Sequence, residues 1–334
     1  MAVKILNVGN ETSAEVKGFL TLCRVLRPIS KGLLCLFVIT FSTLSYTQES
    51  KELVLHFRED QPEVERQVES KRIIEALKQG VEKIDIDHAI IKGDLDFFAG
   101  ASPAPLEESG LEPERIQELK NSEVSVVYFV KAHISITNCK LEGDLQAGFT
   151  LESNRSVVFQ KDINFNNTTF VKDKKVNFSY STFQGGAYFS WASFQDEADL
   201  NDATFKEEAI FSWASFAKGV DLTLASYPKL RISWPQLEGR LGCPLQNIQE
   251  KIKEEWVSVD ELVLWQEVYL RLIKNFEEIG DTRSADDAYY HYRYTMPKFK
   301  TARLDSNPGE EYIVGRGWWE KTVDSSYNAV QTIF

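Results

Sequence analysis

The residues best suited to chemistry are scattered along this chain and form no group. The four histidines, His56, His88, His133 and His291, share no spacing that could hold a metal ion, and no C-x-x-C pair accompanies them. The chain has no G-x-S-x-G nucleophile motif, no Walker-type phosphate loop and no dinucleotide-binding glycine motif. The sequence therefore predicts no catalytic residue, no metal site and no cofactor.

Two small groups of acidic residues are the remaining candidates. Asp286, Asp287 and His291 fall within two turns of one expected helix, a spacing that general acid–base catalysis can use. Asp94 and Asp144 each follow a glycine and could bind a cation through their carboxylates. We favour plainer roles: a solvated helix face for the first group, and for the second a turn in which Gly takes a positive φ and Asp bonds its own backbone.

Charge and composition exclude some classes of function. Fifty acidic against 38 basic residues give a net charge of −12, which argues against a protein that binds nucleic acid through its phosphates. Apolar residues at 43% and charged residues at 26% are typical of a globular chain. The 334 residues suffice for one long domain or two smaller ones, and four cysteines are too few for a disulfide framework.

An internal repeat dominates the middle of the chain. Between residues 178 and 222, large apolar residues recur at steps that alternate between five and six, which gives a period of eleven. The segment SWASF at residues 190–194 returns at residues 212–216, two periods later. We predict that the recurring residues form the core: Phe178, Phe183, Phe189, Phe194, Leu200, Phe205, Phe211, Phe216 and Leu222.

This spacing fits neither a helix nor an ordinary strand, whose side chains repeat every 3.6 and 2.0 residues. It fits a ribbon that turns a corner after each short straight side and points one large residue per side inward. Four sides make a coil of about 20 to 22 residues, and coils stack about 4.8 Å apart. The sequence therefore predicts a mainly β solenoid, with phenylalanines of successive coils piled into one column. A phenylalanine-rich β-sandwich is the alternative, but the hairpin turns that it needs are missing.

The repeat resembles the pentapeptide-repeat family, whose pattern is A-[DN]-[LF]-x-x. Residues 187–189 (AYF) and 198–200 (ADL) carry the small-x-large core of that pattern, and the match spans about residues 163–227. An extra residue in alternate pentads, as at Gly185-Gly186, departs from the pattern and should broaden one corner. The resemblance implies a right-handed quadrilateral parallel β-helix.

A degraded form of the repeat precedes the regular one. Residues 84–95 align with residues 134–145, so that isoleucines, leucines and a Gly-Asp pair correspond. Residues 99–122, between the two copies, contain three prolines and many glutamates, and we interpret them as an insertion with a short helix from Pro113. The predicted β-helix domain therefore spans residues 84–227.

Helical regions are expected on both sides of the β-helix. Residues 48–83 should hold a linker and a capping helix near 61–80, because Val64, Val68, Ile73 and Leu77 have helical spacing. Residues 228–334 should form an α-helical C-terminal region, with a hairpin of two helices around Gly280. The hairpin is similar to a region that follows the repeats in some pentapeptide-repeat proteins. Whether Cys139 pairs with Cys243 stays open.

Residues 1–47 indicate a signal peptide or a membrane anchor. An apolar run at residues 32–44 follows three basic residues and is shorter than the about 20 residues that a spanning helix needs. A buried helix is the alternative. We therefore expect an exported or membrane-anchored protein of the periplasm or cell envelope, or a cytoplasmic one if residues 32–44 are no signal. Membrane contact through this run or through the Trp-rich C-terminal tail is a further expectation.

Trp191 and Trp213 are the candidate surface for a protein partner. In the geometry that the resemblance implies, their indoles point outward and stack on successive coils. Trp is enriched at binding hot spots, which favours a role in recognition. Large indoles also tend to be buried, and the interpretation that we favour is that the helical hairpin or the tail covers them.

The leading functional hypothesis is a non-catalytic scaffold that presents its β-helix walls to an unknown protein partner. The second is an acidic DNA mimic that inhibits a DNA-binding enzyme, as some members of the family do. Residues 163–227 carry eight acidic and five basic residues, however, so their net charge is only −3. The third is a regulatory segment related to pentapeptide-repeat membrane channels.

Overall fold

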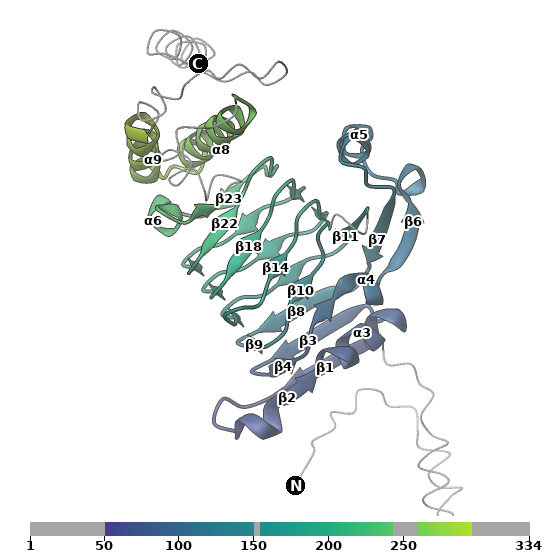
Figure 1. The fold of residues 1–334 in the computed structure, drawn as a ribbon. Coiled ribbons are helices and arrows are strands. Elements are labelled where there is room, and N and C mark those ends of the chain that lie inside the picture. Colours follow the sequence, from purple (N-terminus) through teal and green to yellow (C-terminus); the bar gives the residue numbers. More distant parts are fainter. Residues whose placement is uncertain (1–50, 150–153, 243–258, 296–334) are drawn as a thin grey trace, which may run out of the picture. The chain divides into compact units, whose positions relative to one another are not determined.

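The computed structural model describes residues 51–149, 154–242 and 259–295. Its centre contains four β-sheets, which we name A to D (Figure 1). Sheet A contains β1 (Glu52–His56), β3 (Lys83–Asp87), β8 (His133–Thr137), β12 (Ile163–Asn164), β16 (Ala187–Tyr188), β20 (Ala209–Ile210) and β23 (Leu230–Arg231). Sheet B contains β2 (Gln67–Glu69), β4 (Ile90–Lys92), β9 (Lys140–Leu141), β13 (Thr169–Phe170), β17 (Ser193–Phe194) and β21 (Ser215–Phe216).

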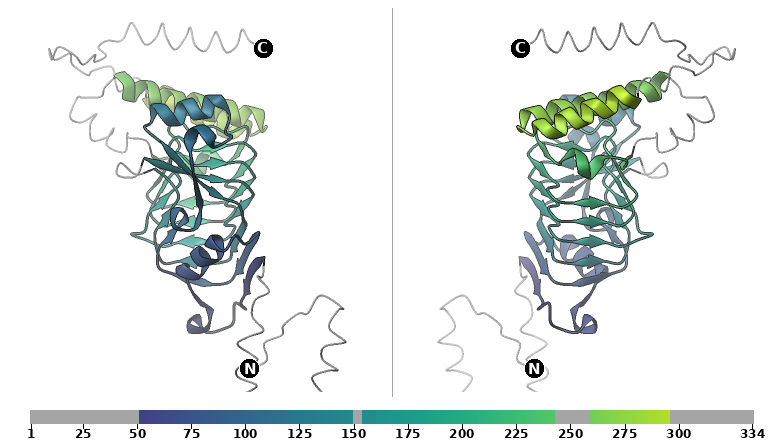
Figure 2. Two further views of the ribbon diagram at one scale, coloured as in Figure 1. Left: turned by 90° about the vertical axis from the view of Figure 1, so that its right-hand side faces the viewer. Right: turned by 90° about the vertical axis from the view of Figure 1, so that its left-hand side faces the viewer.

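Sheets C and D complete the set. Sheet C contains β5 (Leu95–Asp96), β10 (Leu145–Gln146), β14 (Val176–Asn177), β18 (Glu197–Asp199), β22 (Gly219–Asp221) and β24 (Leu241–Gly242). Sheet D contains β6 (Ser102–Pro105), β7 (Val126–Val130), β11 (Arg155–Phe159), β15 (Thr182–Phe183) and β19 (Thr204–Phe205). From β12 to β20 the chain visits sheets A, B, C and D in rotation, and strands within a sheet pair in parallel. The repeat region is a β-solenoid whose coils stack on one another (Figure 2).

The observed register follows the spacing of the repeat. Ala187 pairs with Ala209, and Phe194 pairs with Phe216, each exactly one 22-residue coil apart. In the degraded part, Ile84 pairs with Ile134 and Leu95 with Leu145, as the alignment of the two segments predicts. Apolar side chains therefore stay over apolar side chains from coil to coil, which buries each inward face between its neighbours.

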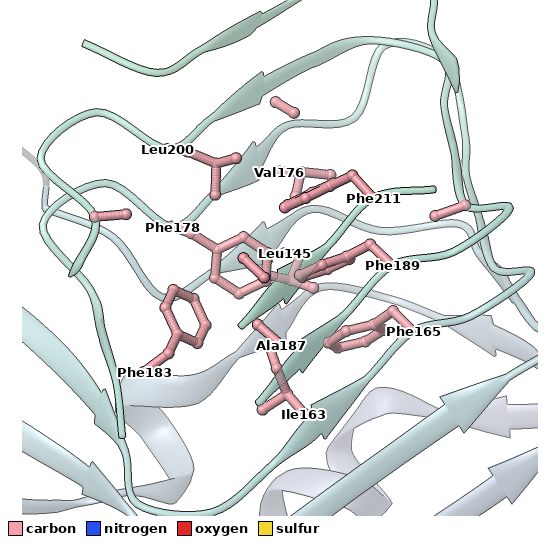
Figure 3. Packing of buried hydrophobic residues seen from close by; sticks show 14 of the residues in the cluster. Leu145, Ile163, Phe165, Val176, Phe178, Phe183, Ala187, Phe189, Leu200 and Phe211 are labelled. Carbon is pink, nitrogen blue, oxygen red and sulfur yellow. The ribbon is translucent and has the colours of Figure 1, made fainter. Parts of the chain in front are cut away.

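The core contains three columns of stacked phenylalanines, where the sequence led us to expect one. Phe189 lies between Phe165 and Phe211, with ring centroids 5.7 and 4.8 Å away (Figure 3). The second column is Phe170, Phe194 and Phe216, and the third is Phe159, Phe183 and Phe205. Sheet C supplies a mixed column of Phe178, Leu200 and Leu222. All nine residues proposed for the core are buried.

The solenoid begins earlier than residue 84, because β1 pairs with β3 and β2 pairs with β4. The helix expected near residues 61–80 is accordingly shorter: a 3₁₀ turn, η1, covers Glu63–Arg66 and the helix α3 covers only Ser70–Lys78. Val68 points into the core from a strand, and Val64 is 79% exposed. Residues 67–69 form a strand because they pair with β4, although their apolar residues have helical spacing.

The insertion packs back onto the solenoid. It contains α4 (Phe97–Gly100), β6, the 3₁₀ turn η2 (Leu106–Glu108) and α5 (Pro113–Asn121), which begins at the proline that the sequence indicated. Strand β6 pairs antiparallel with β7 and was not expected. A second small core holds this segment against sheet D: Leu106, Leu111, Leu119, Val124, Val127 and Val158.

The last coil and the helical hairpin form one packed unit. The solenoid continues beyond residue 227 through β23, α6 (Trp234–Leu237) and β24, and α8 (Val259–Glu278) and α9 (Thr282–Thr295) follow. The buried Asn275 bonds both the N–H and the C=O of Leu230, at 2.9 and 2.8 Å. The Ser284 hydroxyl accepts from the backbone N–H of Trp234 at 2.9 Å. These bonds attach the hairpin to the end of the solenoid.

None of the helices within the described ranges is long and apolar enough to cross a membrane. The expected signal or anchor at residues 1–47, the Trp-rich tail and Cys243 lie outside the described residues.

Candidate interaction surface

The corner between sheets A and B carries a column of residues in the left-handed backbone region. His88, Asn138, Asn167, Trp191 and Trp213 have φ between 52° and 62° and follow one another on successive coils. Asn and His enter this region readily, whereas bulky residues rarely do, and the conformation costs an L-residue about 1–2 kcal/mol. Tryptophan therefore occupies two positions where the backbone favours asparagine.

The two indoles are exposed and stack on each other. Trp191 is 62% and Trp213 is 70% exposed, and their rings lie 5.4 Å apart at 15°. From the sequence we favoured burial of both indoles, but α8 and α9 do not cover them. These helices instead cover Trp234, which lies in the next coil and packs against Tyr269 and His291.

The two segments of chain that carry the indoles contain no charged residue. Residues 187–195 and 209–217 contain no acidic or basic side chain. Alternation along the strands points Tyr188 and Ile210 outward beside the indoles, and both are half-buried. We call the following six residues the tryptophan surface: Tyr188, Trp191, Ser193, Ile210, Trp213 and Ser215.

Ion pairs border this surface on both sides. Lys218 Nζ lies 2.6 Å from Asp196 Oδ2 where the chain passes from sheet B to sheet C, and this bond lowers the pKa of Asp196. Arg231 Nε lies 2.6 Å from Glu208 Oε1 near the passage from sheet D to sheet A. A neutral aromatic centre with a charged rim is the usual composition of a protein–protein interface.

The opposite corner, between sheets C and D, is occupied by the insertion. Arg115 of α5 is 2% exposed and donates to Asp202 Oδ1 at 2.6 Å and to the carbonyls of Tyr180 and Asp202 at 2.9 and 2.8 Å. Tyr180, Asp202 and Leu224 have φ between 53° and 58°, so this corner has the same left-handed backbone conformation as the corner between sheets A and B. No sequence pattern indicated a role for Arg115, because its partners are 65 and 87 residues away.

A cleft of about 540 Å³ separates α5 from α8. Its lining includes Glu118, Leu224, Lys274 and Glu278. Glu118 pairs with Arg115, and Lys274 lies 3.7 Å from Glu278, so several charged groups in the cleft already have protein partners. The cleft offers no convergent set of groups that would define a ligand.

The acidic candidates have structural roles. Asp94 Oδ1 accepts from the N–H of Asp144, and Asp144 Oδ1 accepts from the N–H of Lys175, at 2.9 and 2.8 Å. These carboxylates therefore bond the next coil, not their own backbone as we expected. Gly93 has the expected positive φ of 81°; Gly143 is instead needed because a Cβ there would overlap the backbone of Gly93.

The remaining candidates are likewise not assembled into a site. Asp287 lies near Arg283, whereas His291 bonds the Tyr269 hydroxyl at 2.9 Å, so the two side chains have different partners. Cys139 is buried and free, and burial raises the pKa of its thiol to about 12. Within the described ranges, no group of three or more His, Cys, Asp or Glu side chains is placed to hold a metal ion.

Comparison with known proteins agrees with the repeat. Residues 173–215 match the family model described as pentapeptide repeats, with nine copies. This segment of the chain therefore consists of pentapeptide repeats. Neither a curated protein nor a solved structure matches it. The family match covers the coils that carry Trp191 and Trp213, so the tryptophan surface is built on pentapeptide repeats.

Proposed function

We propose that this pentapeptide-repeat protein is a non-catalytic scaffold that binds a protein partner through the tryptophan surface. The observation that carries the proposal is the exposed pair of stacked indoles on backbone that favours asparagine. Exposed apolar area and a strained conformation both oppose stability, and strained positions concentrate at functional sites. A partner that covers the indoles would offset the cost of exposing them.

The composition of the surface indicates the kind of partner. Trp and Tyr with surrounding serines provide rigid contact area and adaptable hydrogen bonds, a combination typical of protein-binding surfaces. Because residues 187–195 and 209–217 are uncharged, the matching patch on the partner should be apolar and neutral at its centre. The ion pairs at Lys218 and Arg231 would lie at the rim.

The alternative of a DNA mimic is weakened by the placement of the acidic residues. Asp199 and Asp221 lie against the wall, where burial raises their pKa, and Asp202 is paired with Arg115. A DNA mimic needs a concentrated negative field on its surface, and these three carboxylates contribute little to one. A regulatory role related to membrane channels has only the helical hairpin in its favour.

The proposal includes two finer points. The winding is that of a right-handed quadrilateral β-helix, as in the family, and four sheets visited in rotation support this. The location is an envelope compartment, reached through residues 1–47. Sequencing the N-terminus of the protein from fractionated cells tests the location; an uncleaved chain in the cytoplasm would contradict it.

The experiment on the tryptophan surface replaces both tryptophans by asparagine, the residue that the two preceding coils have at the same corner. In Trp191→Asn/Trp213→Asn the backbone keeps a residue suited to positive φ, as at Asn138 and Asn167. We expect this variant to have unchanged or higher thermal stability. A photo-reactive residue placed at Ser215 should capture a partner in the parent chain and should no longer capture it in the variant.

The matched control is Leu224→Asn, which makes the same backbone change at the opposite corner on an exposed apolar residue. It should leave capture of the partner unchanged. Equal capture by the double tryptophan variant would overturn the proposal. A marked loss of stability in that variant would instead assign the indoles a structural role.

A further inference from the structure

Strand β1 is the first strand of sheet A and lies at its N-terminal edge. Strand β1 pairs with β3, and no second strand pairs with it in the part of the chain that the structure describes. Leu53 and Leu55 point inward but are only half-buried, whereas Ile84 and Ile86, their partners on β3, are fully buried. The N-terminal end of sheet A is therefore an unfinished layer, and exposed edges of this kind tend to pair with another strand.

The hydrogen bonds of β1 show which of its backbone groups are available. Lys83 donates to the carbonyl of Lys51, and Phe57 donates to the carbonyl of Asp87. Because backbone groups alternate in direction along a strand, residues 51, 53, 55 and 57 face β3. The N–H and C=O groups of Glu52, Val54 and His56 consequently point away from the solenoid.

The opposite end of the solenoid is covered. Trp234 of α6 and Leu237 are buried, and Asn275 and Ser284 attach the hairpin to the last coil. Head-to-tail stacking of copies would require two open ends, so we place the pairing between copies at the β1 end. Contact between two identical surfaces gives a closed twofold dimer.

We infer that β1 is a dimerisation strand, which pairs antiparallel with β1 of a second copy about a twofold axis at Val54. In this register the three outward-facing residues meet: Val54 lies opposite Val54, and Glu52 lies opposite His56 of the second copy. Antiparallel residues whose backbone groups point at each other exchange two hydrogen bonds, so these three pairs form six.

The side chains of β1 complement themselves in this register. Glu52 meets the imidazole of His56 on both sides of the axis, and each His56 also lies beside its own Asp85, with 3.2 Å between Nε2 and Oδ1. Val54, 47% exposed in the single chain, is covered by its counterpart. Leu53 faces Leu55 of the second copy on the inner side, which completes the unfinished layer.

Cysteine cross-linking tests the register. Residues directly opposite in such a pair have Cα atoms about 5.5 Å apart, within the range of a disulfide. Val54→Cys should therefore form a disulfide-linked dimer under mild oxidation, well above the background of the parent chain. Glu52→Cys should not link to itself, but should link to His56→Cys when the two variants are mixed. Val64→Cys, an exposed valine of η1 near the same end, is the matched control and should not form a disulfide-linked dimer.

Mass measurement tests the dimer itself. Light scattering of the parent chain should give the mass of two copies, and Val54→Pro should give one copy at the same concentration, with an increase of about ten-fold or more in the dissociation constant. Proline is tolerated because the lost N–H of residue 54 faces away from β3. A parent chain of monomer mass at every concentration, or equal cross-linking of Val54→Cys and Val64→Cys, would overturn the inference.

Discussion

Single positions in the repeat show how the backbone of the solenoid selects residue types. In one column of sheet C, Asn177, Asp199 and Asp221 are in register, and each side-chain oxygen accepts from the N–H two residues later. An amide does this without charge, whereas burial raises the pKa of the Asp199 carboxyl to about 6. The geometry requires an acceptor at this position and does not require a carboxylate.

Asp199→Asn should therefore stabilise the protein at neutral and alkaline pH. The folded pKa of Asp199 lies above its ordinary value of 3.8, so its stabilising contribution is present below pH 4 and is lost as the pH rises through about 6. We expect the variant to gain about 3 kcal/mol in the free energy of unfolding at pH 8 and almost nothing below pH 3.8, measured by urea unfolding.

Asp196→Asn is the opposite case and serves as control. Its bond to Lys218 lowers the pKa of Asp196, so the variant should lose stability at pH 8. If both variants changed stability in the same direction at pH 8, the environment inferred for Asp199 would be wrong.

Among the elements, α5 shows how a distant segment is fixed to the solenoid wall. Its Arg115 fills the corner between sheets C and D and neutralises Asp202, a largely buried carboxyl whose pKa burial raises. Pairing compensates two charges that would each be costly alone. Pro113 predicts the start of the helix but not the wall that the helix contacts.

Arg115→Met should destabilise the protein by about 3 kcal/mol, because Asp202 then remains buried without its partner. The double variant Arg115→Met/Asp202→Asn should recover part of this loss, since asparagine is neutral and suits the positive φ of position 202. A double-mutant cycle by urea unfolding measures the coupling.

Glu118→Ala provides the comparison for this cycle. Glu118 also pairs with Arg115 but is more than half exposed, so its removal should cost at most about 1 kcal/mol. Equal losses for Glu118→Ala and Arg115→Met would contradict the role assigned to the buried pair.

At the scale of the whole molecule, the solenoid is additive. Each coil contributes one residue to each phenylalanine column and buries the coil before it, as Phe183 does between Phe159 and Phe205. In such repeat architectures, stability is approximately a sum over units and their interfaces. The number of coils can therefore change without a change in the contacts of any one coil.

Duplication of residues 187–208 should be tolerated, because the inserted 22 residues begin and end in register with Ala209. We expect cooperative unfolding at an equal or higher guanidinium midpoint, with a steeper denaturant dependence because more surface is buried. The control inserts the same 22 residues in shuffled order. Equal stability of the two insertions would show that the eleven-residue spacing does not control packing.

The sequence by itself determined the solenoid, its coil length, its phenylalanine core and its pentapeptide repeats, because the alternating five- and six-residue steps are a local property of the chain. Only the tertiary structure decided where the solenoid starts and stops: β1, β2, β23 and β24 lie outside residues 84–227, and pairing with neighbouring coils defines them. The same holds for the tryptophan surface. Its stacking follows from the repeat, but its exposure depends on where α8 and α9 pack, and those contacts join residues about 45 to 50 positions apart.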